Sequence, residues 1–180
     1  MNTPWVNAIA YQLVWFSAVI GAQHDQAWPG VLAALVLLAS TWWRSPHRGL
    51  DLRLLAMSMA CGLVIDSACA WLGLLHYAAP MAGPWPWLAP WWILALWAAF
   101  STTLTRSMNW LQARPWLGVL LGGIGAPLAY RGAAALGHSV RITPPDWQAL
   151  VTLGGGWSIA MALMLYIARP HQAVAERHPS

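Results

Sequence analysis

The sequence predicts an all-α polytopic membrane protein, a six-transmembrane-helix bundle, on three observations. Of the 180 residues, 59% are hydrophobic and only 8% are charged, against about 25% charged residues in an average globular chain. The apolar residues are gathered into six long runs. The connections between the runs are short, which leaves no room for a soluble domain. Because a soluble fold of this size could not hide so much apolar surface, we expect residues 1–180 to form a single membrane domain.

The six runs are the predicted helices. A helix needs about 20 residues to cross a ~30 Å hydrocarbon core, and about 17 is the practical minimum. Four runs exceed this length, the first just reaches it and the second is short. The first run has no positively charged flank and no small-residue cleavage site, so we expect a retained helix rather than a signal peptide. The runs cover residues 5–22, 28–43, 54–76, 87–111, 116–137 and 147–168.

The arginines predict the orientation of the bundle. The chain has nine arginines and no lysine, and most of the arginines lie in connections rather than in one basic face, which argues against a nucleic-acid partner. The connections after the first and third runs contain none, and the connection after the fifth contains only Arg141. Since positive residues favour the cytoplasmic side, both termini are predicted to be cytoplasmic. The arginines on the predicted inner side are Arg44, Arg48, Arg53, Arg106, Arg114, Arg169 and Arg177.

The chain is rich in tryptophan, with 15 residues of this type. Those at the ends of runs are typical of the interfacial belts of membrane proteins. Trp15, Trp71, Trp97 and Trp157 lie deeper and are expected to pack helices together or, alternatively, to line a ligand pocket. The predicted belt residues are Trp5, Trp28, Trp42, Trp43, Trp85, Trp87, Trp110, Trp116 and Trp147.

Asp66 is the most informative polar residue because it lies near the middle of the run 54–76. At helical rise it would be ~18 Å from the inner end of that run. A charge at such depth costs ~2.5–3.5 kcal/mol on insertion scales. Gly62, Cys69 and Gly73 share its predicted face and would let another helix approach closely. We therefore expect Asp66 to face the bundle, either protonated or paired with a cation or with hydrogen-bond donors. A helix-packing hydrogen bond without chemistry is the alternative.

Other polar residues fall inside the runs and could form a pocket with Asp66. Two arginines, at positions 106 and 131, are candidate partners for the carboxylate, although either could extend to a membrane interface instead. Amides and hydroxyls inside a span could also simply join helices. The candidate pocket residues are Asn7, Gln12, Asp66, Thr103, Arg106, Ser107, Tyr130 and Arg131.

Known chemical motifs are absent from the sequence. It contains no nucleotide-binding loop, no nucleophile elbow and no zinc-protease motif. Histidines and aspartates occur in the predicted outer connections, but they have no metal-ligand spacing. Cys61 and Cys69 would be about 12 Å apart on one helix, too far for a disulfide. We therefore predict neither a metal nor a cofactor.

These residues resemble a known family. The most specific part is the pattern LW-x-x-F-x-T-x-L-x-x-S-x-x-W from Leu96 to Trp110. Asp66 followed by Gly73, and the segment GAPLAYRGAAALG, extend the likeness over nearly the whole chain. Together they resemble the bacterial inner-membrane family of the domain of unknown function numbered 2878. The resemblance implies a small multi-pass protein of the bacterial inner membrane and implies no catalytic residue.

Three hypotheses for function follow from the sequence. In the first, the bundle binds or moves a lipid-like or small amphipathic molecule in a polar intramembrane pocket around Asp66. In the second, the protein is a membrane-embedded enzyme that modifies a lipid, with Asp66 as acid or base and Arg131 on an anionic head group. In the third, it is an accessory subunit that docks a membrane-protein partner through its Trp- and Gly-rich faces. Membrane lipid is an expected partner in all three.

Overall fold

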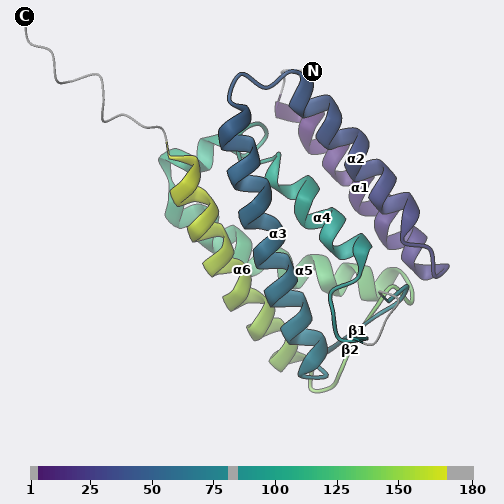
Figure 1. Ribbon diagram of the computed structural model, residues 1–180. Coiled ribbons are helices and arrows are strands. Elements are labelled where there is room, and N and C mark those ends of the chain that lie inside the picture. Colours follow the sequence, from purple (N-terminus) through teal and green to yellow (C-terminus); the bar gives the residue numbers. More distant parts are fainter. Residues whose placement is uncertain (1–3, 81–84, 170–180) are drawn as a thin grey trace, which may run out of the picture.

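The structure is a computed structural model that describes residues 4–80 and 85–169 (Figure 1). In these residues the chain forms six α-helices, one 3-10 helix and one pair of short strands. The elements in chain order are α1 (Pro4–Gln23), α2 (Trp28–Trp43), α3 (Arg48–Trp71), β1 (Leu75–Tyr77), α4 (Trp91–Ser101), η1 (Asn109–Ala113), α5 (Pro115–Leu136), β2 (Val140–Ile142) and α6 (Asp146–Ala168).

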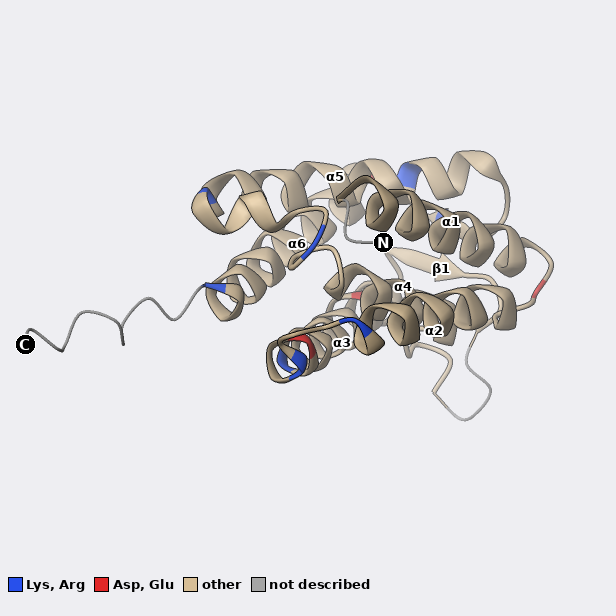
Figure 2. Ribbon diagram, turned by 90° about the horizontal axis from the view of Figure 1, so that it is seen from above, with Lys and Arg blue, Asp and Glu red and all other residues tan. Residues whose placement is uncertain are grey.

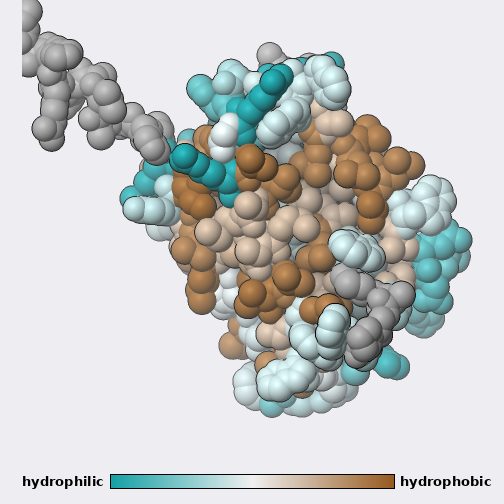
Figure 3. Space-filling model, in the orientation of Figure 1, coloured by the Kyte–Doolittle hydropathy of each residue, from teal (hydrophilic) through white to brown (hydrophobic). Residues whose placement is uncertain are grey.

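Four helices are long and apolar enough to cross a membrane, namely α1, α3, α5 and α6, while α2 and α4 are shorter. Their outward faces carry large apolar side chains, such as Leu13, which is 63% exposed, and Val64, which is 68% exposed. Water would oppose so much exposed apolar surface, whereas lipid tails would not. Figure 3 shows the hydrophobic residues across the middle of one face and hydrophilic residues toward its ends. The predicted helical membrane protein is confirmed at this level.

Helix α4 is the centre of the bundle. Nine of its 11 residues are buried, and α1, α2 and α3 all pack against it (Figure 1). The helix was predicted over residues 87–111. The observed helix α4 is shorter, since it begins at Trp91 and ends at Ser101. The hydroxyls of Ser101, Thr102 and Thr103 each donate to the carbonyl three residues earlier. Such local bonds compete with the helical pattern. The irregular backbone that follows includes buried residues, which is where such backbone is tolerated in membrane proteins.

Helix α3 also differs from the predicted range 54–76, since it begins at Arg48 and ends at Trp71. Gly73 adopts φ +68°, the left-handed conformation in which a helix is terminated. The amides of Gly73 and Leu74 donate to the carbonyls of Ala70 and Cys69, completing this terminal motif. Asp66 is therefore only ~8 Å along the axis from the C-terminal end of α3, rather than near its middle.

A two-stranded antiparallel ladder joins two of the connections that were predicted to be outer ones, and the sequence did not predict the ladder. Strand β1 pairs with β2 so that Leu75 lies opposite Ile142 and Tyr77 opposite Val140. The side chain of Thr143 donates to the carbonyl of Gly73, 2.6 Å away, which ties the ladder to the end of α3. The ladder holds Tyr77 over the end of the bundle.

Helices α5 and α6 pack closely through glycines. A Cβ atom on Gly154 would lie 2.8 Å from the carbonyl oxygen of Gly123, and one on Gly122 would lie 2.5 Å from Cγ of Met161. Small residues let helix backbones approach in this way. Pro127 lies inside α5, as the sequence indicates, and α5 continues past it to Leu136.

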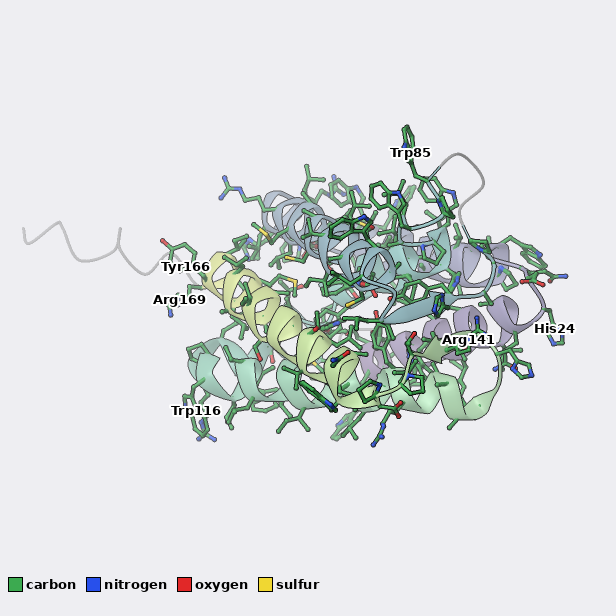
Figure 4. All side chains as sticks on the ribbon, turned by 90° about the horizontal axis from the view of Figure 1, so that it is seen from below. His24, Trp85, Trp116, Arg141, Tyr166 and Arg169 are labelled. Carbon is green, nitrogen blue, oxygen red and sulfur yellow. The ribbon has the colours of Figure 1, made fainter. Side chains whose placement is uncertain are left out.

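Several exposed aromatic and charged side chains lie at the two ends of the bundle. All nine predicted belt tryptophans are exposed. In Figure 4, Trp116, Tyr166 and Arg169 project from one end, while His24 and Arg141 project from the other. Trp71 differs from expectation, because it is 71% exposed rather than packed between helices. Arg177 lies outside the described residues.

Candidate functional site

Asp66 is fully buried, and three donors from three other elements hold its carboxylate. The hydroxyls of Tyr77, in β1, and of Tyr130, in α5, both donate to Oδ1, the former over 2.7 Å. The indole Nε1 of Trp97, in α4, donates to Oδ2 over 2.7 Å. The carboxylate thus joins four elements. The predicted orientation of Asp66 toward the bundle is what the structure shows.

The donors explain how a carboxylate can lie there. Removing a charge from water is costly unless hydrogen bonds replace the lost hydration, and bonds to charged groups are the stronger ones. Gly62 makes room for this arrangement, since its missing side chain is where the ring of Trp97 lies. Burial, and after it the nearby Asp66, raises the pKa of Tyr77 well above the ordinary value, so this phenol remains a donor.

An apolar cavity of about 200 Å³ lies beside this carboxylate. It extends between α1, α4, α5 and α6. Two of the Asp66 donors, Tyr130 and Trp97, form part of its wall, whereas Asp66 does not line it. The other aromatic residues of the wall are Tyr11, Trp15, Trp92, Phe100 and Trp157. Asp66 therefore lies behind the wall and fixes the positions of two of its side chains.

Trp157 lines this cavity and carries a buried polar atom. Its ring stacks on Trp97 with centroids 3.9 Å apart and meets Phe100 edge to face at 5.1 Å. Its Nε1 is buried without a hydrogen-bond partner, the only such side-chain atom found among the described residues. A buried unsatisfied donor costs about 1–3 kcal/mol, and native proteins seldom leave one. A residue of the cavity wall therefore carries a buried N–H group that has no acceptor among the described residues.

The cavity reaches the surface along α5. Gly125 and Ala129 line the cavity and are themselves exposed. A Cβ atom on Gly125 would meet nothing within 4 Å, so this position is open. Helix α1 packs mainly on α2 and α4, while α5 packs mainly on α6. The opening thus lies between two separately packed parts of the bundle, on a side covered by apolar residues.

A second polar cluster lies at the other end of the bundle. The amide of Asn7 donates to Oγ1 of Thr102 over 3.1 Å and accepts from the hydroxyl of Ser107 over 2.8 Å. Asn7 is 4% exposed. These bonds anchor α1 to the irregular segment that follows α4. Thr103, also buried, uses its hydroxyl within its own segment, on Phe100 and on the sulfur of Met108.

The arginines that we expected as partners of Asp66 have other partners. Arg106 forms an ion pair with Asp51 at 3.2 Å and also donates to the carbonyl of Thr41. Arg131 forms an exposed ion pair with Asp146 at 3.3 Å. Gln12, which we expected among the pocket residues, is exposed on α1. The structure therefore brings Asp66 and Tyr130 together, groups Asn7 with Ser107, and leaves Gln12, Arg106 and Arg131 apart from Asp66.

Two of the carboxylate's donors were missed by the sequence reasoning. Tyr77 lies in a predicted outer connection, and only the ladder brings it to Asp66. Trp97 was expected as a deep packing residue, and its distance of 31 positions from Asp66 in the chain gives no hint of the bond. The described residues contain no group of three or more metal-ligating side chains placed to hold an ion.

Comparison with known proteins identifies a family and gives no functional relative. Neither the curated proteins nor the solved structures contain a match to this chain. The family profile described as "Protein of unknown function (DUF2878)" matches residues 4–163. This range covers all six helices except the last turns of α6. The chain belongs to the DUF2878 family.

Proposed function

We propose that the protein crosses the bacterial inner membrane six times, with both termini in the cytoplasm. The two shorter helices, α2 and α4, would complete the crossings. Helix α2 has 16 residues, just below the usual minimum. Helix α4 is enclosed by protein, so the irregular backbone beyond Ser101 can complete its crossing without contact with lipid.

We further propose that the aromatic-lined cavity beside Asp66 binds part of a lipid-like molecule that carries a hydrogen-bond acceptor. The observation that carries this proposal is the unpartnered Nε1 of Trp157 in the apolar wall. A carbonyl, ester or hydroxyl oxygen of the ligand would accept from it. An entry route from the membrane is supported by the exposed positions Gly125 and Ala129 at the surface of the cavity.

The size of the cavity limits what it can enclose. Cavities of about 150 Å³ bind benzene, whereas drug-sized ligands occupy about 300–1,000 Å³. At about 200 Å³ the cavity suits one ring or a short chain segment, so the rest of a lipid-like molecule would extend through the opening. Asp66 would act indirectly, by holding the rings of Tyr130 and Trp97 in place.

Photolabelling would test this proposal. The probe is a neutral long-chain methyl ester with a diazirine in its chain, added to the purified protein in lipid nanodiscs. The substitution Gly125→Leu should reduce saturable labelling of the α5 and α6 peptides at least tenfold, because it fills the opening. Gly132→Leu is the matched control: it lies on the same helix, also in open space, but does not line the cavity. Equal labelling of the two variants would contradict the proposal.

A second comparison tests the proposed hydrogen bond from Trp157 to the ligand. Methyl palmitate should compete with the probe more strongly than hexadecane, which has no acceptor. The substitution Trp157→Phe keeps an aromatic ring in the cavity and removes the N–H group. It should therefore abolish the advantage of the ester over the hydrocarbon. If methyl palmitate and hexadecane competed equally well for the wild-type protein, that result would count against a role for Trp157.

A further inference from the structure

A large basic cleft lies at the opposite end of the bundle from the β1–β2 ladder. It has a volume of about 1070 Å³. Its walls come from the start of α1, the end of α2, the α2–α3 connection, the start of α3, the segment after α4 and the end of α6. In Figure 2, many of the blue segments (Lys and Arg) lie around these helix ends. Chain segments far apart in sequence thus build one concave surface.

The charge of the cleft is strongly unbalanced. Four arginines line it, at positions 44, 53, 106 and 169, together with His47. Asp51 is the one acidic residue that lines it among the described residues. Its carboxylate already forms an ion pair with Arg106, whose Nη2 lies 3.2 Å from Oδ2 of Asp51. The cleft therefore retains an excess of positive charge.

The arginines of the cleft differ in how they are held. Arg106 is fixed, since it donates to Asp51, to Oγ1 of Thr105 and to the carbonyl of Thr41. Arg44 and Arg53 are exposed, and their guanidinium groups form no hydrogen bond with the described residues. A guanidinium presents a planar set of donors that matches a phosphate or carboxylate group. Arg44 and Arg53 are thus available for an anion.

A general preference for arginine on the cytoplasmic side does not explain this arrangement. That preference concerns the number of arginines in connections and does not require a cavity. Here the free arginines border a hollow that also contains the amides of Asn109 and Gln112. Basic hollows between transmembrane helices on the cytoplasmic side are suited to anionic lipid head groups.

We infer that this cleft is a binding site for a phosphate group, with Arg44 and Arg53 as its main charged contacts. The site is independent of the cavity beside Asp66. The exposed rings of Trp42 and Trp43 lie close in sequence to Arg44, and tryptophan favours the level of the head groups. A phosphate of an anionic membrane lipid and a free cytoplasmic phosphate share this chemistry, and the experiment separates them.

The experiment compares two double variants that lose the same charge. Arg44→Gln with Arg53→Gln removes the free arginines of the cleft. Arg131→Gln with Arg141→Gln removes two arginines at the other end of the bundle, where His24 and Arg141 project (Figure 4). Binding to the purified full chain is measured by native mass spectrometry with phosphatidylglycerol, with phosphatidylcholine of the same chains, and by thermal shift with inorganic phosphate.

For the wild type we expect phosphatidylglycerol or inorganic phosphate to bind in preference to phosphatidylcholine. The cleft variant should weaken that binding at least tenfold, and the control variant should change it less than twofold. A response to phosphatidylglycerol alone identifies a lipid head group, and a response to inorganic phosphate identifies a soluble ligand. No preference for the anionic probes, or the same loss in both variants, would overturn the inference. None of these results bears on the photolabelling experiment with Gly125→Leu, so the two proposals can fail separately.

Discussion

Three aspartates of this chain are held in three different ways. Asp146 pairs with Arg131 at the surface, and Asp51 pairs with the half-buried Arg106. Asp66 has no cationic partner among the described residues and is held by two phenols and an indole. Neutral donors stabilise a carboxylate without requiring a second buried charge, whose own desolvation would be costly. A purely hydrogen-bonded arrangement therefore suits the interior of an apolar bundle.

Replacing Asp66 by asparagine should destabilise the fold. An amide offers one accepting oxygen instead of two, and its NH₂ group cannot accept from a phenol or an indole. At least one of the three buried donors would then lose its acceptor. We expect Asp66→Asn to lower the free energy of unfolding by about 1–3 kcal/mol. Thermal unfolding in mild detergent would measure this.

Asp146→Asn is the matched control for that experiment, since it makes the same chemical change at an exposed position. Its ion pair with Arg131 has side chains that are 57% and 45% exposed for the arginine and the aspartate. Exposed pairs contribute about 0–1 kcal/mol. Equal melting temperatures for the two variants would show that the three donors do not stabilise the fold through Asp66.

At the scale of the element, the end of α3 determines whether the site forms. The turn at Gly73 directs the chain from the helix into β1, and β1 carries Tyr77 to Asp66. Gly73 has open space around it, so the backbone conformation alone requires glycine there. The hydroxyl cluster from Ser101 to Thr103 acts similarly on α4, where it ends the helix. A glycine turn thus ends α3, and a short hydroxyl-rich segment ends α4.

The substitution Gly73→Ala should destabilise the protein by about 1–2 kcal/mol, because a Cβ atom is disfavoured at positive φ. Gly49→Ala is the control: Gly49 also has open space but lies in the first turn of α3. There alanine should be neutral or stabilising by up to about 1 kcal/mol. Unfolding in denaturant compares them. A stable Gly73→Ala variant would mean that the turn is not needed to position β1.

At the scale of the whole molecule, the arginines separate two ends. Among the described residues, Arg44, Arg53, Arg106 and Arg169 border the basic cleft, whereas Arg131 and Arg141 lie at the ladder end. The basic end is built by α1, α2, α3, the segment after α4 and α6. The structure thus places these segments at one end of the molecule, and the six-span topology is a proposal that labelling can test.

Labelling of single cysteines would test this topology in cells. In a Cys61→Ala, Cys69→Ala background, His24→Cys and His138→Cys should react with an impermeant maleimide in intact spheroplasts. Ser45→Cys and Asn109→Cys should react only after the membrane is opened. Reaction of Asn109→Cys from outside would show that the chain does not cross the membrane through α4.

Composition and pattern alone determined the class of the protein and the approximate place of each helix. Long apolar runs form helices wherever lipid or protein leaves the backbone no other partner. The mid-run aspartate was expected to face inward for the same reason. These conclusions concern single segments, whose surroundings can be inferred without knowing which segments are neighbours.

The partners of Asp66 were decided only by the tertiary structure. Tyr77, Trp97 and Tyr130 lie 11, 31 and 64 positions away in sequence and meet at one carboxylate because of a turn, a ladder and the packing of α4. The aromatic cavity and the basic cleft are also spaces between elements. A local pattern records how each residue suits its own helix, whereas a cavity depends on how helices distant in sequence pack together.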